Sequence, residues 1–200
     1  MSSSSLIRLA GLAALASGVL SAIGDLLTLV VSRQNLENPQ LATTTSYTVD
    51  LLYLLSTALL LLGLVGLYTS QSQATGLLGL VGFLTAFLGT VLLVGALWFM
   101  VFGTPYLAAQ DPELAESVLG QTGYLLMLLF GAVGWILFGV ATLRARVYPG
   151  WAAILLIVGG VIAFLPVPLV GIVFSVAVAY LGYLLFTGRV RSDEQPSRVS

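Results

Sequence analysis

Three long stretches of the chain, residues 51–110, 117–143 and 147–188, contain no charged side chain. The surface of a soluble domain needs charged groups, and such domains usually have about 25% charged residues. This chain has 8% charged and 58% hydrophobic residues. A lipid bilayer is the solvent that fits this composition. The sequence therefore predicts an all-α, polytopic transmembrane helix bundle that forms a single domain over residues 1–200.

Six apolar runs are each suited to crossing a hydrocarbon core about 30 Å thick. They cover residues 6–31, 47–68, 76–102, 123–143, 147–165 and 169–186. The last two come from one apolar region that prolines at 166 and 168 divide, because proline lacks the amide hydrogen that a helix needs. A re-entrant hairpin is the alternative for this region. Ala-Leu-Ala at 14–16 resembles a signal-peptide cleavage site, but the first run continues to Val31, so we expect a retained helix.

Polar segments separate these runs. Residues 32–46, 69–76 and 103–122 are expected to be loops. Within the last of them, Asp111 is suited to an N-cap, Pro112 to the first helical position and Gly120 to a helix end. We therefore expect a short interfacial helix in the outer loop between spans three and four.

The arginines indicate the orientation, because loops rich in basic residues stay in the cytoplasm. Six spans place both termini on one side. With the N-terminus inside, the cytoplasmic arginines are Arg8, Arg144, Arg146, Arg189, Arg191 and Arg198. Only Arg33 is then outside. The sequence therefore predicts cytoplasmic N- and C-termini in a bacterial plasma membrane.

Asp25 lies far inside the first apolar run. A charged residue at the centre of a membrane helix costs about 2.5 to 3.5 kcal/mol on insertion scales. Asp25 follows a stripe of small residues at spacings of three and four, which allows a neighbouring helix to approach closely: Gly11, Ala14, Gly18 and Ser21. The carboxyl group is therefore expected on a packed face. There it is protonated, hydrogen-bonded to a hydroxyl or backbone group, or holding a cation.

Three polar residues of the second run share one helical face near the same end of the bundle: Asp50, Tyr53 and Thr57. Together with Asp25 they form a candidate proton or cation site that opens outwards. The alternative is an interhelical hydrogen bond of Asp25, with Asp50 stabilised at a helix start by the helix dipole. The residues themselves leave both interpretations open.

The absence of several residue types excludes much chemistry. The chain has no cysteine and no histidine, and all seven basic residues are arginine. Thiolate chemistry, imidazole ligation of metal or haem, and lysine Schiff bases are thereby excluded. We expect no enzyme activity, no cofactor, no metal site and no nucleic-acid partner. Seven glycines at helical spacing are expected to pack helices together: Gly11, Gly18, Gly79, Gly82, Gly89, Gly131 and Gly134.

The segments "RLAGLAALASGVL" at the start and "RVYPGWAAILLIVGG" before the last hairpin carry a resemblance. The chain resembles an uncharacterised family of small bacterial multi-pass integral membrane proteins. The resemblance implies a six-helix or similar bundle in the inner membrane, and it carries over no site residues.

Two functions from different classes fit these observations. The first is a non-enzymatic accessory, sensor or assembly subunit that acts through helix contacts, with the bilayer and either a second copy or another membrane protein as partners. The second is a small transporter or proton- or cation-coupled carrier that uses Asp25.

Overall fold

The computed structural model describes residues 3–37, 39–110, 121–162 and 171–189, and these are helical apart from two short connections at residues 146–149 and 188–189. Helix α1 covers Ser3–Glu37 and α2 covers Pro39–Trp98. A π-helical segment, η1 (Phe99–Gly103), leads into the short α3 (Thr104–Gln110). The chain then forms α5 (Gln121–Ala145), α6 (Gly150–Ile162) and α7 (Gly171–Thr187).

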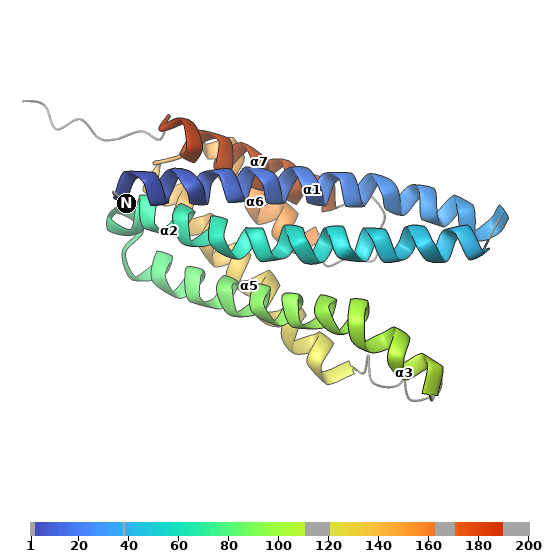
Figure 1. The fold of residues 1–200 in the computed structure, drawn as a ribbon. Coiled ribbons are helices and arrows are strands. Elements are labelled where there is room, and N and C mark those ends of the chain that lie inside the picture. The colour runs from blue at the N-terminus through green and yellow to red at the C-terminus, as the bar shows by residue number, and fades with distance from the viewer. Residues whose placement is uncertain (1–2, 38, 111–120, 163–170, 190–200) are drawn as a thin grey trace, which may run out of the picture.

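Helix α2 is two antiparallel segments joined at Gly76. This residue has φ +56° and ψ −149°, a backbone conformation that only glycine adopts at little cost. Figure 1 shows α2 running back towards the start of α1, reversing there, and running out again as a second segment. Tyr68 and Phe83 stack across the reversal with ring centroids 4.4 Å apart. One glycine thus produces a hairpin without a loop.

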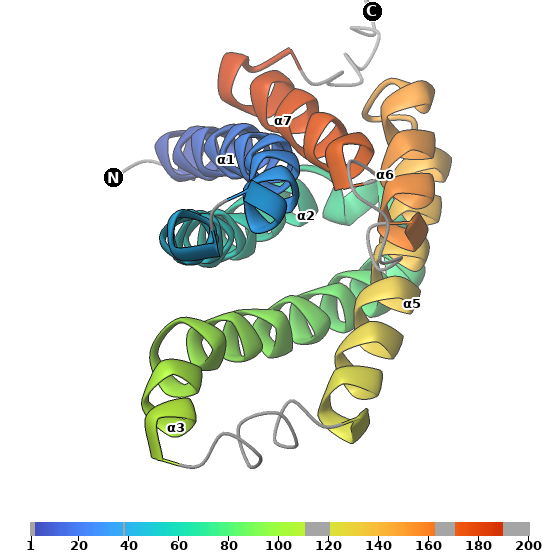
Figure 2. The same cartoon turned by 90° about the vertical axis from the view of Figure 1, so that its right-hand side faces the viewer.

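The helices lie in an up-and-down arrangement. The start of α1, the reversal at Gly76, the α5–α6 turn and the end of α7 lie at one end of the bundle (Figure 1). We call this the Gly76 end, and the other the α1–α2 end. Helix α1 packs against α2 and α7, the second segment of α2 packs against α5, and α6 lies between α5 and α7 (Figure 2).

The described helices match the length and hydropathy of membrane spans. Within that part of the chain, three helical stretches are long and apolar enough to cross a membrane: Ser5–Ser32, Thr45–Leu107 and Leu125–Ala145. Helices α6 and α7 are shorter and equally apolar. Many large apolar side chains point outwards, with Leu77 the most exposed at 75%. Such a surface is suited to lipid and not to water.

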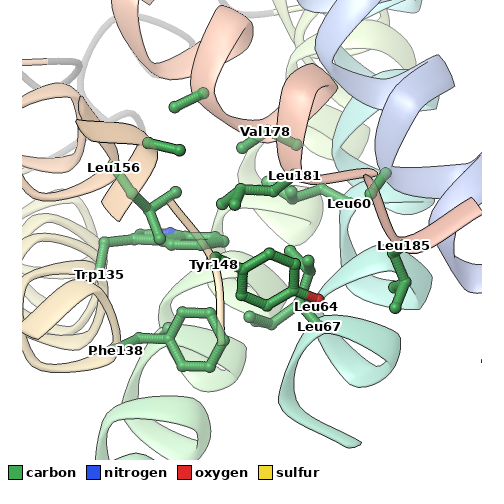
Figure 3. Close-up of a cluster of buried hydrophobic side chains, with 14 of the residues drawn as sticks. Leu60, Leu64, Leu67, Trp135, Phe138, Tyr148, Leu156, Val178, Leu181 and Leu185 are labelled. Atoms are coloured by element: carbon green, nitrogen blue, oxygen red, sulfur yellow. The ribbon is translucent and has the colours of Figure 1, made fainter. Parts of the chain in front are cut away.

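A hydrophobic core lies towards the Gly76 end, where α1, α2, α5, α6 and α7 all contribute buried side chains (Figure 3). Leu64 of α2, Phe138 of α5 and Leu156 of α6 are completely buried. The aromatic ring of Tyr148, from the α5–α6 turn, lies among them and is 3% exposed. This core holds the second half of the chain against α2.

The prediction of a loop at residues 32–46 is wrong. Helix α1 continues to Glu37 and α2 begins at Pro39, so only residue 38 separates them among the positions described. Proline is well suited to the first position of a helix, where its missing amide hydrogen has no partner to lose. Ser32 also donates its hydroxyl hydrogen to the carbonyl of Thr28, at 2.9 Å, which satisfies that side chain within the helix.

The loop predicted at residues 69–76 is also helical up to Gly76. Its hydroxyls bond to carbonyls one turn earlier, such as Thr69 to Val65 at 2.7 Å and Thr75 to Gln71 at 3.0 Å. The reversal that the loop was expected to make occurs at Gly76 alone. The predicted interfacial helix at 111–120 and the proline break at 166–168 lie outside the described residues.

Candidate functional site

Asp25 lies on the face of α1 that is packed between α2 and α7. A Cβ atom added to Gly18 would lie 2.5 Å from the Ala179 backbone nitrogen of α7, so the two backbones are in direct contact. On the other side, Ser21 hydrogen-bonds Ser56 of α2 across 3.1 Å. The small residues that precede Asp25 therefore bring both neighbouring helices close to its carboxyl group.

Two hydroxyl groups from different helices donate hydrogen bonds to the Asp25 carboxyl group. The Tyr53 hydroxyl of α2 donates to Oδ1 at 2.8 Å, and the Ser175 hydroxyl of α7 donates to Oδ2 at 3.3 Å. Among the described residues Asp25 makes no ion pair. We call Asp25, Tyr53 and Ser175 the carboxyl junction, because these three side chains join α1, α2 and α7.

The first residue of α7 lies directly against this carboxyl group. A Cβ atom on Gly171 would lie 2.7 Å from Oδ1 and 3.0 Å from Oδ2 of Asp25. Real Cβ atoms essentially never lie that close to another heavy atom, so a larger residue at this position would force the Asp25 side chain to shift. The N-terminus of a helix carries a partial positive charge that stabilises a nearby anion. The start of α7 thus adds favourable electrostatics to the two hydrogen bonds.

The other three residues of the predicted proton or cation site, Asp50, Tyr53 and Thr57, differ in how they relate to Asp25. Tyr53 contacts Asp25 directly. Thr57 is 6% exposed and donates its hydroxyl hydrogen to the Tyr53 carbonyl at 2.7 Å, so it supports the α2 backbone instead of Asp25. Asp50 is partly buried within electrostatic reach of the Tyr53 hydroxyl, and makes no hydrogen bond to Asp25 among the described residues.

Sequence reasoning missed the α7 side of the junction. Ser175 is 150 positions from Asp25, and no periodicity within one helix relates residues so far apart. Thr28 was also missed, although it is three residues from Asp25 on the same helix and its hydroxyl lies 3.4 Å from that of Tyr53. Helical spacing from Asp25 could have identified Thr28, whereas only the three-dimensional structure identifies Ser175 and Gly171.

A second polar cluster lies near the Gly76 end. The Gln71 side chain is 2% exposed and donates its Nε2 hydrogen to Thr142 Oγ1 of α5 at 2.9 Å. Its Oε1 atom has no hydrogen-bond partner in the described part of the protein. Ser70 and the Tyr148 hydroxyl hydrogen-bond at 2.7 Å, and burial raises the pKa of Tyr148 to about 12. Tyr148 therefore stays neutral at physiological pH.

The predicted packing glycines lie mostly at helix crossings. An added Cβ atom on Gly11 would lie 2.5 Å from the backbone nitrogen of Phe186 in α7. Gly82 and Gly89 of α2 contact Phe138 and Gly131 of α5 in the same way, and Gly134 of α5 contacts the backbone at Ala86 of α2. Gly79 is different, because its nearest neighbour is Thr75 of its own helix.

The carboxyl junction accepts hydrogen bonds through Asp25, and a carboxyl group can also bind a proton or a cation. Among the described residues, no group of three or more metal-binding side chains is close enough to hold a metal ion. Comparison of the chain with known protein families, curated proteins and solved structures finds no match.

Proposed function

We propose that this chain is an integral membrane protein of six spans, with the two segments of α2 counted separately. Each segment on either side of Gly76 is long enough for a crossing of about 30 Å at 1.5 Å per residue. Helices α6 and α7 would be the short fifth and sixth spans. The alternation of helix direction in Figure 1 supports this arrangement.

The Gly76 end of the bundle is proposed to face the cytoplasm of a bacterial cell. Arg8, Arg144, Arg146 and Arg189 are all exposed and belong to segments at that end. Basic residues that flank spans are retained in the cytoplasm. Both termini are then cytoplasmic. A thiol-reactive, membrane-impermeant label should modify a cysteine placed at Arg189 only after cells are opened, and the cysteine-free chain gives no background.

Within the membrane the protein is proposed to be a non-enzymatic accessory, sensor or assembly subunit that acts through helix contacts. The observation that carries this proposal is the carboxyl junction. The carboxyl group of Asp25 accepts hydrogen bonds from both neighbouring helices. These bonds hold the helices together. Interhelical hydrogen bonds in membranes typically contribute about 0.6 kcal/mol and up to about 1.7 kcal/mol.

A proton- or cation-coupled carrier is the second candidate function. It is favoured by one observation: Asp25 makes no ion pair among the described residues, while Asp50 adds a second carboxyl group near Tyr53. Unpaired carboxyl groups within membrane proteins often mark ion pathways. A chain of 200 residues would then need copies of itself to form a pathway.

Flux measurements in proteoliposomes distinguish the two functions. Proton and cation flux would be compared for the wild type and Asp25→Asn between about pH 5 and about pH 8, where perturbed carboxyl groups titrate. The subunit proposal predicts no flux from either protein. Flux in the wild type that Asp25→Asn abolishes, with the variant still folded, would refute that proposal and establish the carrier.

A further inference from the structure

The carboxyl junction connects the position of α7 to the charge of a single side chain. The Asp25 carboxyl group has two oxygen atoms, and each accepts a hydrogen bond from a hydroxyl group of a different helix. Gly171 places the first turn of α7 against both oxygens. The contacts of Ser175 and Gly171 with Asp25 are therefore contacts to a group that can gain or lose a proton.

The polar side chains on the packed face of α1 differ in exposure from one end of the helix to the other. Along the packed face of α1, Ser17 is 2% exposed, Ser21, Asp25 and Thr28 are partly buried, and Ser32 is exposed. Exposure thus increases towards the α1–α2 end. On the other side of Asp25, Ala14 is completely buried and packs against the glycines of α2 and α7. Packed backbone thus closes the way to Asp25 from the Gly76 end, which leaves the α1–α2 end as the side from which a proton would arrive.

From this geometry we propose that Asp25 is a proton-binding site, filled from the α1–α2 end, whose occupancy decides whether the first turn of α7 stays docked on α1. This inference rests on the proposed sensor role and names its signal. Hydronium transfers its proton to one carboxylate oxygen: its O–H bond breaks, an O–H bond forms on the carboxyl group, and water leaves. The carboxylate form keeps its charge-assisted hydrogen bonds and its attraction to the α7 dipole. The neutral acid loses both advantages.

Few other charged groups can account for a pH response at this place. Helix α2 contributes Tyr53 and Asp50. Helix α7 has no charged side chain, and Arg189 follows it at the end opposite Gly171. On α1 the other charged residues are Arg8, Arg33 and Glu37, and none of them is within two turns of Asp25 along the helix. Among the side chains that the structure describes, Asp50 is therefore the one other carboxyl group, and it serves as the control.

The protein contains a natural reporter for the first turn of α7. Trp135 of α5 is 3% exposed and contacts Phe174 edge-on, with ring centroids 4.8 Å apart. Phe174 is three residues after Gly171 and next to Ser175. Helices α5 and α6 carry no carboxyl group. Undocking of the first turn would expose Trp135 to a more polar environment.

The test is a fluorescence titration of the full-length chain in lipid nanodiscs. Replacing Trp98 and Trp151 by Phe leaves Trp135 as the single tryptophan, since the chain has three. We expect its emission to shift to longer wavelength in one transition as the pH falls. Asp25→Asn should remain at the low-pH wavelength at every pH. Asp50→Asn, the same chemical change one turn away from Tyr53, should retain the transition.

Gly171→Ala provides an independent variant that leaves Asp25 intact. Its methyl group should push the Asp25 carboxyl group away from its place against the first turn of α7 and thereby change the pH of the transition. Absence of a transition in the wild type would overturn the proposal, as would a full transition in Asp25→Asn or a transition at unchanged pH in Gly171→Ala. A flat titration together with absent flux would remove only the proton as signal and would leave the proposed subunit function standing.

Discussion

The close contact between α2 and α5 leads to a prediction that one pair of glycines tests. A Cβ atom on Gly89 would lie 2.6 Å from the Cα atom of Gly131, whereas carbon atoms pack at about 3.5 to 4.0 Å. The two helices would have to separate by roughly 1 Å. Overpacking of this kind typically costs about 1 to 3 kcal/mol. Gly89→Ala should therefore lower the free energy of unfolding.

Gly95 provides the matched control on the same helix. An added Cβ atom there meets nothing within 4 Å. Both substitutions gain helix propensity, worth up to about 1 kcal/mol over glycine. The difference between Gly89→Ala and Gly95→Ala therefore isolates the steric cost, about 1 to 3 kcal/mol. Unfolding by sodium dodecyl sulfate, followed by circular dichroism, measures it. Equal stabilities of the two variants would refute the described packing of α2 on α5.

Two further predictions concern the polar cluster near the Gly76 end. Thr142→Val removes the one partner of the buried Gln71 amide and should destabilise the protein by about 1 to 3 kcal/mol in the same assay, whereas Gln71→Met should cost less than Thr142→Val. Tyr148 has its pKa raised from 10.0 to about 12, so its folded form holds the proton more tightly than the unfolded chain does. Its contribution is complete below pH 10 and should be lost between pH 10 and pH 12, at about 1.4 kcal/mol per pH unit. Alkaline unfolding of Tyr148→Phe should lack this loss, and an unchanged pH dependence would contradict the burial of the hydroxyl.

The apolar runs predicted much of the fold because burial in lipid needs long uncharged segments. The predicted run 123–143 lies within α5, and 169–186 corresponds closely to α7. The loops predicted from polar composition were wrong, since residues 32–46 and 69–75 are helical at the described positions. Serine and threonine side chains bond to carbonyls of the preceding turn, so a polar composition did not require a loop there.

The candidate site could be predicted only within single helices. Helical spacing placed Asp25 on a packed face and Tyr53 on the α2 face that reaches it. Spacing also grouped Thr57 and Asp50 with them, although Thr57 bonds to its own backbone. The contribution of α7 depends on how distant helices pack, which no local pattern in the sequence encodes. Ser175 and Gly171 therefore emerge only from the structure.

The most direct test of the account is a double-mutant cycle between Asp25 and Tyr53. Unfolding free energies would be measured for the wild type, Asp25→Ala, Tyr53→Phe and the double variant. The hydrogen bond at 2.8 Å predicts a coupling energy of about 0.6 to 1.7 kcal/mol, the range for interhelical bonds in membranes. If the two single effects simply add, the carboxyl group of Asp25 does not join α1 to α2, and the carboxyl junction on which the proposed function rests does not exist.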